Sequence, residues 1–149
     1  MHIIGIAETK IAESSNHKLY LANPYYEIYT ANSNEKPANK QKSSMGSALA
    51  VLKTLQLYIN NILKLAETTI AVDFFSSRNQ RIRIISVYLT MTNKKLNKKT
   101  QKTVVEWTQQ VIAREYNVVI IGTSIQIGLK KRNYYHCSRW QNRLACQAY

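Results

Sequence analysis

Apolar residues recur along the chain in short runs that predict strands. The first run, His2–Ala7, is apolar and rich in β-branched residues, which predicts a strand buried on both faces. Alternating aromatic residues predict a short strand at Tyr25–Thr30. Two further strands are predicted at Thr69–Phe75 and Val118–Ile121, the second closed by Gly122.

The middle of the chain holds one clear strand and one ambiguous segment. Residues 81–90 are apolar on both faces, which predicts a central strand after a turn at Ser76–Gln80. Arg81 and Arg83 are expected to lie outside. Ser47–Ile62 fits helical spacing, but its first part, SALAVL, fits a strand equally well.

A helix is predicted between the central strand and the last apolar run. Thr92–Lys102 carries five lysines, which predicts a solvated loop leading into the helix. Thr103 and Glu106 have the spacing of a capping box. An apolar stripe at helical spacing follows, formed by Val104, Trp107, Val111 and Ile112. A helix between two buried strands predicts a layered α/β fold.

Charge is the most informative property of the composition. The 149 residues include 21 Lys and Arg against 8 Asp and Glu, a net charge of +13. A field of this sign attracts polyanions, so nucleic acid is the first expected partner, with DNA ahead of RNA. An anionic membrane surface is the second candidate, and a solvated basic surface without a dedicated partner is the alternative. The sequence predicts no membrane span and no signal peptide, so the expected location is intracellular, nuclear or cytoplasmic.

Acidic and metal-binding residues are scarce. Asp73 is the only aspartate in the chain, which restricts any mechanism that needs several. Cys137 and Cys146, with His136 beside the first, are too few for a structural zinc site and are expected to be free thiols.

Four segments in a fixed order carry a resemblance to a known family. They are IIGIAETK, RIRIISVYLT, VVEWTQQVI and VVIIG, which run from about Ile3 to Gly122. The set resembles the endonuclease/exonuclease/phosphatase superfamily. It is most similar to the apurinic-type endonuclease domains encoded with reverse transcriptases in non-LTR retrotransposons. The resemblance implies a partial four-layer α/β sandwich of two packed mixed sheets flanked by helices. It also implies a Mg²⁺ site at the strand ends, where a phosphodiester is hydrolysed.

The resemblance also implies roles for individual residues. Glu8 matches the metal-binding glutamate of the family, and Lys10 completes the same motif. Tyr88 matches the family tyrosine beside the scissile phosphate. After the VVIIG segment the family has Gly-Asp-Phe-Asn, but here Thr123 replaces the aspartate and Ile125 the asparagine. Neither replacement supplies the lost carboxylate or amide, and such losses lower a rate by orders of magnitude.

Further family features are expected outside the matched segments. The family strand with a catalytic asparagine would precede Met1, and no aspartate follows Gly122 to form the closing Asp-His pair. The chain is therefore divided into a partial family-like domain, 1–128, and a basic, aromatic C-terminal tail, 129–149.

These observations favour a truncated, degenerate retrotransposon-type endonuclease domain with little or no activity. Whether the chain is an enzyme stays open at this point. The alternatives are a nuclease that completes its site with other residues or another chain, a non-catalytic nucleic-acid-binding module, and an interaction protein or poorly folding product.

Overall fold

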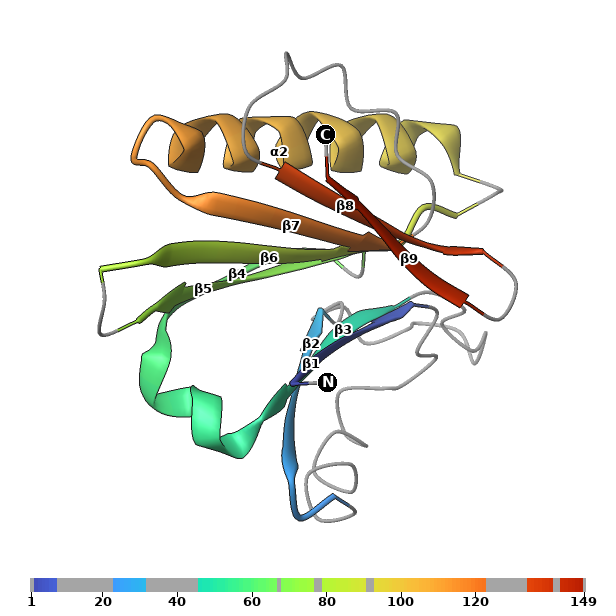
Figure 1. Ribbon diagram of the computed structural model, residues 1–149. Coiled ribbons are helices and arrows are strands. Elements are labelled where there is room, and N and C mark those ends of the chain that lie inside the picture. The colour runs from blue at the N-terminus through green and yellow to red at the C-terminus, as the bar shows by residue number, and fades with distance from the viewer. Residues whose placement is uncertain are drawn as a thin grey trace.

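The structure, a computed structural model, holds two sheets and one long helix (Figure 1). Side chains are described for residues 2–7, 23–31, 46–66, 68–76, 79–90 and 93–122, and the backbone alone for 134–140 and 143–148.

The smaller sheet has three antiparallel strands in the order β1-β3-β2. The strands are β1 (Ile3–Ala7), β2 (Tyr26–Ala31) and β3 (Ser47–Leu52). The strands predicted at His2–Ala7 and Tyr25–Thr30 are thereby confirmed. However, β1 is only half-buried, because one of its faces is open and leaves Ile4 37% exposed.

The larger sheet has six strands in the order β4-β5-β6-β7-β8-β9. The strands are β4 (Ile59–Leu65), β5 (Thr69–Phe75), β6 (Arg81–Val87), β7 (Asn117–Gly122), β8 (Tyr134–Trp140) and β9 (Arg143–Ala148). The β6–β7 and β7–β8 pairs are parallel, and the other pairs are antiparallel. The sheet is therefore mixed, with its parallel strands in the centre.

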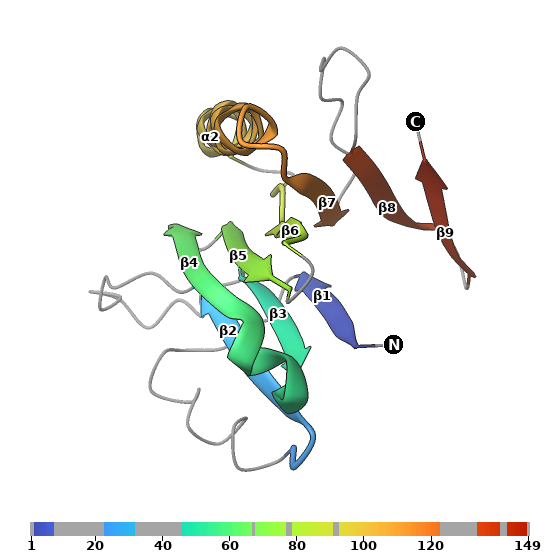
Figure 2. The ribbon, with the colours of Figure 1, turned by 60° about the vertical axis from the view of Figure 1, so that its left-hand side comes forward.

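The helix α2 (Lys94–Ile112) connects the parallel strands β6 and β7 and covers one face of the larger sheet. The smaller sheet packs on the opposite face, as Figure 2 shows with α2 and β1–β3 on either side of β6. In the described part of the chain these are three layers, and only one sheet is mixed. The expected partial four-layer sandwich is thus shown in its coarser form, as two packed sheets with one main helix, and a helix layer outside the smaller sheet stays a prediction. No helix among the described residues is long and apolar enough to cross a membrane.

Strand alternation assigns each side chain of the larger sheet to one of two cores. Along β5, Ile70 and Val72 pack against the smaller sheet, whereas Ala71 packs beneath α2. Val104 and Val111 contribute the predicted apolar stripe of α2 to the second core and are nearly fully buried. The larger sheet is apolar on both faces because a layer covers each of them.

The helix begins earlier than predicted. Asn93 caps it, since the Asn93 side chain accepts a hydrogen bond from the Leu96 N–H at 2.9 Å. The segment Thr92–Lys102, expected to be a loop, therefore lies almost entirely in the first turns of α2. Thr103 and Glu106 lie inside the helix and do not form its cap.

Two other segments needed the structure to define them. The ambiguous residues 47–62 form β3, the short 3-10 helix η2 (Lys53–Tyr58) and the start of β4. The C-terminal residues, for which no element was predicted, form β8 and β9 and extend the larger sheet. The predicted domain boundary at residue 128 falls between β7 and β8 and stays a prediction.

Candidate functional site

The carboxyl ends of β6 and β7 lie side by side. These strands are parallel, and Val87 at the end of β6 is opposite Gly122 at the end of β7. Tyr88 follows the first strand and Thr123 follows the second. In sheets with parallel strands, the carboxyl edge is where ligand sites commonly form. This edge is therefore the candidate functional site.

The strand β1 ends at the same place from the other sheet. Its last residue, Ala7, is opposite Ser47 of β3, and the Ser47 hydroxyl donates a buried hydrogen bond of 2.8 Å to the Ser86 hydroxyl of β6. Earlier in β1, Gly5 lies so close to β7 that an added Cβ would be 2.5 Å from a methyl carbon of Ile121. Small residues thus let the ends of β1, β6 and β7 converge.

The convergence brings together the strands that precede three of the sequence-predicted residues. Glu8 follows β1, Tyr88 follows β6 and Thr123 follows β7. Glu8, Lys10, Thr123 and Ile125 themselves lie outside the described residues. Their roles as metal ligand, catalytic residue or degenerate family positions stay predictions.

Gly122 allows the backbones of β6 and β7 to approach closely at this edge. Its φ is +149°, and a Cβ at this position would lie 1.9 Å from the Val87 carbonyl oxygen. Any side chain would collide with the backbone of β6, so β7 can end beside Val87 only with glycine.

Hydrogen bonds to its backbone hold the segment after β6 against the residue before β5 and against α2. The N–H of Tyr88 donates to the carbonyl oxygen of Thr68 at 2.8 Å. The side-chain amide of Asn97 accepts from the N–H of Thr90 at 3.0 Å and donates to the carbonyl oxygen of Thr90. Tyr88 is half-buried in this fixed segment, and its proposed role beside a phosphate stays a prediction.

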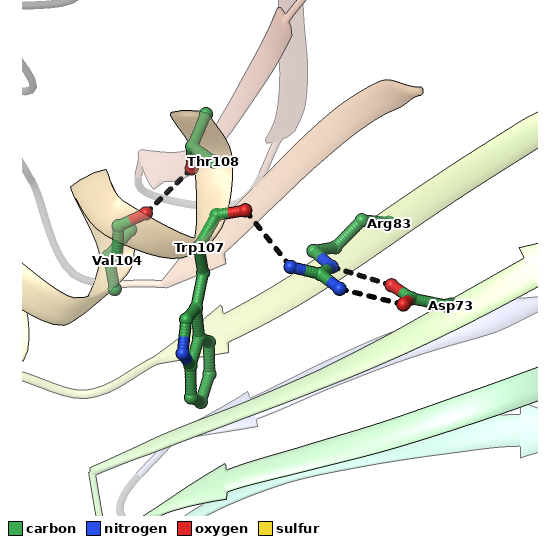
Figure 3. Close-up of polar contacts among 5 residues, drawn as sticks. All are labelled: Asp73, Arg83, Val104, Trp107 and Thr108. Carbon is green, nitrogen blue, oxygen red and sulfur yellow. Dashed lines mark hydrogen bonds and ion pairs between the residues drawn. The ribbon is translucent and has the colours of Figure 1, made fainter. Parts of the chain in front are cut away.

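The only aspartate of the chain lies in a buried ion pair beneath α2 (Figure 3). Asp73 of β5 accepts two hydrogen bonds from the guanidinium of the opposite Arg83, at 2.6 and 2.7 Å. A third guanidinium nitrogen of Arg83 donates to the Trp107 carbonyl oxygen of α2 at 2.9 Å. The prediction that Arg83 lies outside is therefore wrong, because α2 covers this face of the sheet and leaves Arg83 5% exposed.

This ion pair is separated from the converging strand ends. Arg83 precedes Val87 by four residues, which is about 13 Å along a strand. Its side chain lies on the face beneath α2, whereas Ser86 faces β3. Both carboxylate oxygens of Asp73 are engaged by Arg83. Asp73 therefore cannot serve as a metal ligand or a base at the candidate site without breaking a buried pair.

The described residues do not fit a magnesium site at the strand ends. Magnesium prefers carboxylate and other hard oxygen ligands. The four described carboxylates belong to Glu27 in β2, Asp73 in β5, Glu106 in α2 and Glu115 in the turn after it. Within the described ranges, no three His, Cys, Asp or Glu side chains are grouped closely enough to hold a metal ion.

These features define an α/β domain in which two sheets pack together and a long helix covers the larger one. The structure is similar to that of the human nocturnin catalytic domain, a member of the endonuclease/exonuclease/phosphatase superfamily that was determined with a bound sulfate anion. The TM-score is 0.58 at 12% sequence identity, and the match covers 81% of this chain. The likeness at this identity is one of fold.

Two further results limit what the likeness to nocturnin shows about this chain. The chain spans half of the nocturnin chain it matches. No family model matches the sequence, and no curated protein does either. The likeness agrees with the fold expected from the four ordered segments and concerns the fold alone, and these comparisons do not support a retrotransposon origin.

Proposed function

We propose that this protein is a nucleic-acid-binding domain with a degenerate endonuclease/exonuclease/phosphatase fold and little or no hydrolase activity. The observation that carries the proposal is that the only aspartate of the chain is held in a buried ion pair. Both carboxylate oxygens of Asp73 accept hydrogen bonds from Arg83 in a buried ion pair. Arg83 lies about 13 Å along β6 from the end of the strand at the candidate site. A strongly basic chain with this fold keeps the means to attract a phosphodiester but lacks an available aspartate to activate water.

The residues after β7 support the loss of activity. In the family resemblance, an aspartate and an asparagine follow the glycine that ends this strand. Here Thr123 and Ile125 occupy those positions. A threonine hydroxyl carries no charge to orient or deprotonate a water, and isoleucine offers no hydrogen bond.

The charge supports the binding role. A net charge of +13 on 149 residues favours association with a polyanion and speeds the encounter. We propose DNA ahead of RNA as the ligand, an intracellular location, nuclear or cytoplasmic, and descent from a retrotransposon-type endonuclease. This ancestry rests on the order of the four sequence segments.

One experiment tests binding and chemistry together. The full chain is titrated at several salt concentrations into a fluorescein-labelled DNA duplex and, separately, into an RNA duplex of the same sequence. The same preparation is incubated with supercoiled plasmid and Mg²⁺. We expect binding that weakens steeply as salt rises, because each phosphate contact releases counterions. We expect no nicking above an EDTA control.

The Glu8→Ala variant is the matched control for chemistry. Nicking that depends on Mg²⁺ and disappears in Glu8→Ala would show an active metal site and overturn the degenerate assignment. Absence of DNA and RNA binding by protein that unfolds cooperatively would overturn the binding assignment.

A further inference from the structure

Five lysines form a continuous exposed face on the first half of α2. This lysine face consists of Lys94, Lys95, Lys98, Lys99 and Lys102, all of them exposed. At about 100° per residue, the five positions fall within an arc of about 140° around the helix. The buried positions of α2, Thr100, Val104, Thr108 and Val111, lie on the opposite side. The lysine face is therefore the outer surface of the helix layer.

Most of this charge has no acidic partner among the residues that the structure describes. Lys102 lies 3.8 Å from Glu106 in an exposed pair, an arrangement that contributes little. Among the described residues, no carboxylate pairs with the other four lysines. Lys94, Lys98 and Lys102 repeat at intervals of four residues, where like charges repel each other. A bound polyanion would remove this repulsion.

We propose that the lysine face binds the phosphate backbone of a nucleic acid. This inference rests on the proposed function and names the surface of the protein through which the nucleic acid binds. From Lys94 to Lys102 the helix rises about 12 Å. Over that length the lysine face presents a row of cations to a phosphate backbone that carries one negative charge per nucleotide. The complementarity is one of charge.

The position of α2 extends this surface toward the converging strand ends. The helix begins just after the segment from Tyr88 to Thr90, which leaves the carboxyl end of β6. The first lysines therefore lie at the same end of the larger sheet as the candidate site (Figure 1). A nucleic acid on the lysine face can follow α2 from this edge along the outside of the molecule.

A membrane surface is a poorer match for the same lysines. Helices that lie in a membrane interface insert an apolar face between the lipids. The apolar face of α2 is buried on the larger sheet through Val104 and Val111. Gln101, an exposed neighbour of the lysines on α2, is polar and gives the outer surface no apolar side chain to insert between lipids.

The test compares two pairs of exposed lysines with the same loss of charge. The first variant is Lys94→Gln/Lys98→Gln on α2. The matched control is Lys53→Gln/Lys64→Gln, on η2 and β4. The affinity of the full chain for a fluorescein-labelled DNA duplex is measured between about 50 and about 200 mM salt, and the slope of log affinity against log salt is compared.

For the α2 variant, we expect the slope to fall by about 1.8, that is 0.9 for each lost phosphate contact. The control variant should lose less than half as much. Equal losses in the two variants would show that only overall charge matters and would overturn the assignment of the surface while leaving the proposed function intact. No binding by the wild-type chain would overturn both.

Two further measurements test whether weaker binding reflects loss of the fold and whether the lysine face binds a membrane. Thermal unfolding should be unchanged or shifted upward in the α2 variant, so weaker binding cannot be attributed to loss of fold. Vesicles containing phosphatidylserine replace DNA in a parallel titration. Tighter binding to vesicles than to DNA, lost in the α2 variant, would assign the lysine face to a membrane and overturn the proposal.

Discussion

Positive charge lies on both sides of α2, buried in the larger sheet beneath the helix and exposed on the outer surface of the helix itself. On the inner side, Arg83 is buried and its guanidinium is shared between Asp73 and the Trp107 carbonyl oxygen. On the outer side, the lysine face is exposed, and Lys102 alone among its lysines has a carboxylate partner in the described residues.

The difference separates charge that maintains the fold from charge that is available to a ligand. A buried cation must be paired because removal from water is unfavourable. The Arg83 pair accordingly connects β5, β6 and α2. Exposed lysines need no partner, and their mutual repulsion slightly lowers the stability of the helix. Substitutions on the two sides should therefore change different measurable properties.

The largest effect is expected for Asp73→Asn. This change leaves the buried Arg83 charge without its carboxylate, and we expect the free energy of unfolding to fall by about 3–5 kcal/mol. Urea unfolding followed by circular dichroism measures it. Where the variant is still folded, its slope of log affinity against log salt for DNA should equal that of the wild-type chain.

The control for this prediction removes both charges at once. The Asp73→Leu/Arg83→Met variant leaves no unpaired buried charge, so its stability should be much closer to that of the wild-type chain. A loss below about 1 kcal/mol in Asp73→Asn would show that Arg83 does not depend on this partner.

A smaller effect is expected for Thr100→Val, also on the inner side of α2. The hydroxyl groups of Thr100 and Thr68 are 2.9 Å apart and buried. Removing one leaves Thr68 with weaker contacts, and we expect a loss of about 1–2 kcal/mol in the free energy of unfolding. Thr103→Val, at a half-buried position of the same helix, is the control. Equal losses in the two variants would attribute the effect to helix propensity.

The smallest effect, and one of opposite sign, is expected for Lys98→Gln on the outer side. Lys98 lies four residues from both Lys94 and Lys102, so its removal relieves two repulsive pairs. At low salt we expect the free energy of unfolding to rise by about 0.5 kcal/mol. The gain should vanish at high salt because exposed charges are screened. A loss of stability, or a gain equal to that of Lys64→Gln, would contradict the repulsion.

Much of the fold was predictable because it follows local pattern. Thr69–Phe75 was predicted with the bounds of β5, and the apolar stripe of α2 packs as predicted. The start of α2 was not predicted, because lysine and asparagine are common in loops. The hydrogen bond that caps the helix at Asn93 favours a helix in spite of that composition. At residues 47–62 the periodicity fits both states, and pairing with β1 and β2 selects the strand for the first part.

The Asp73–Arg83 pair could have been predicted from the spacing of the two residues around a turn, although the apolar pattern of the strands did not reveal it. The two residues are equidistant from the centre of the turn at Ser76–Gln80, so a hairpin places them opposite each other. Opposite charges directly across a hairpin attract each other, so the sequence indicates that the two residues pair but not that the pair is buried. Its burial depends on α2, which comes later in the chain.

The sequence by itself determined the order of the apolar strands, the apolar stripe of the helix and the excess of positive charge, since these depend only on residue type and spacing. Only the tertiary structure decided which cation is buried and paired and which strand ends meet. Those outcomes depend on contacts between distant residues, such as the hydrogen bond from Ser47 to Ser86 and that from Arg83 to Trp107.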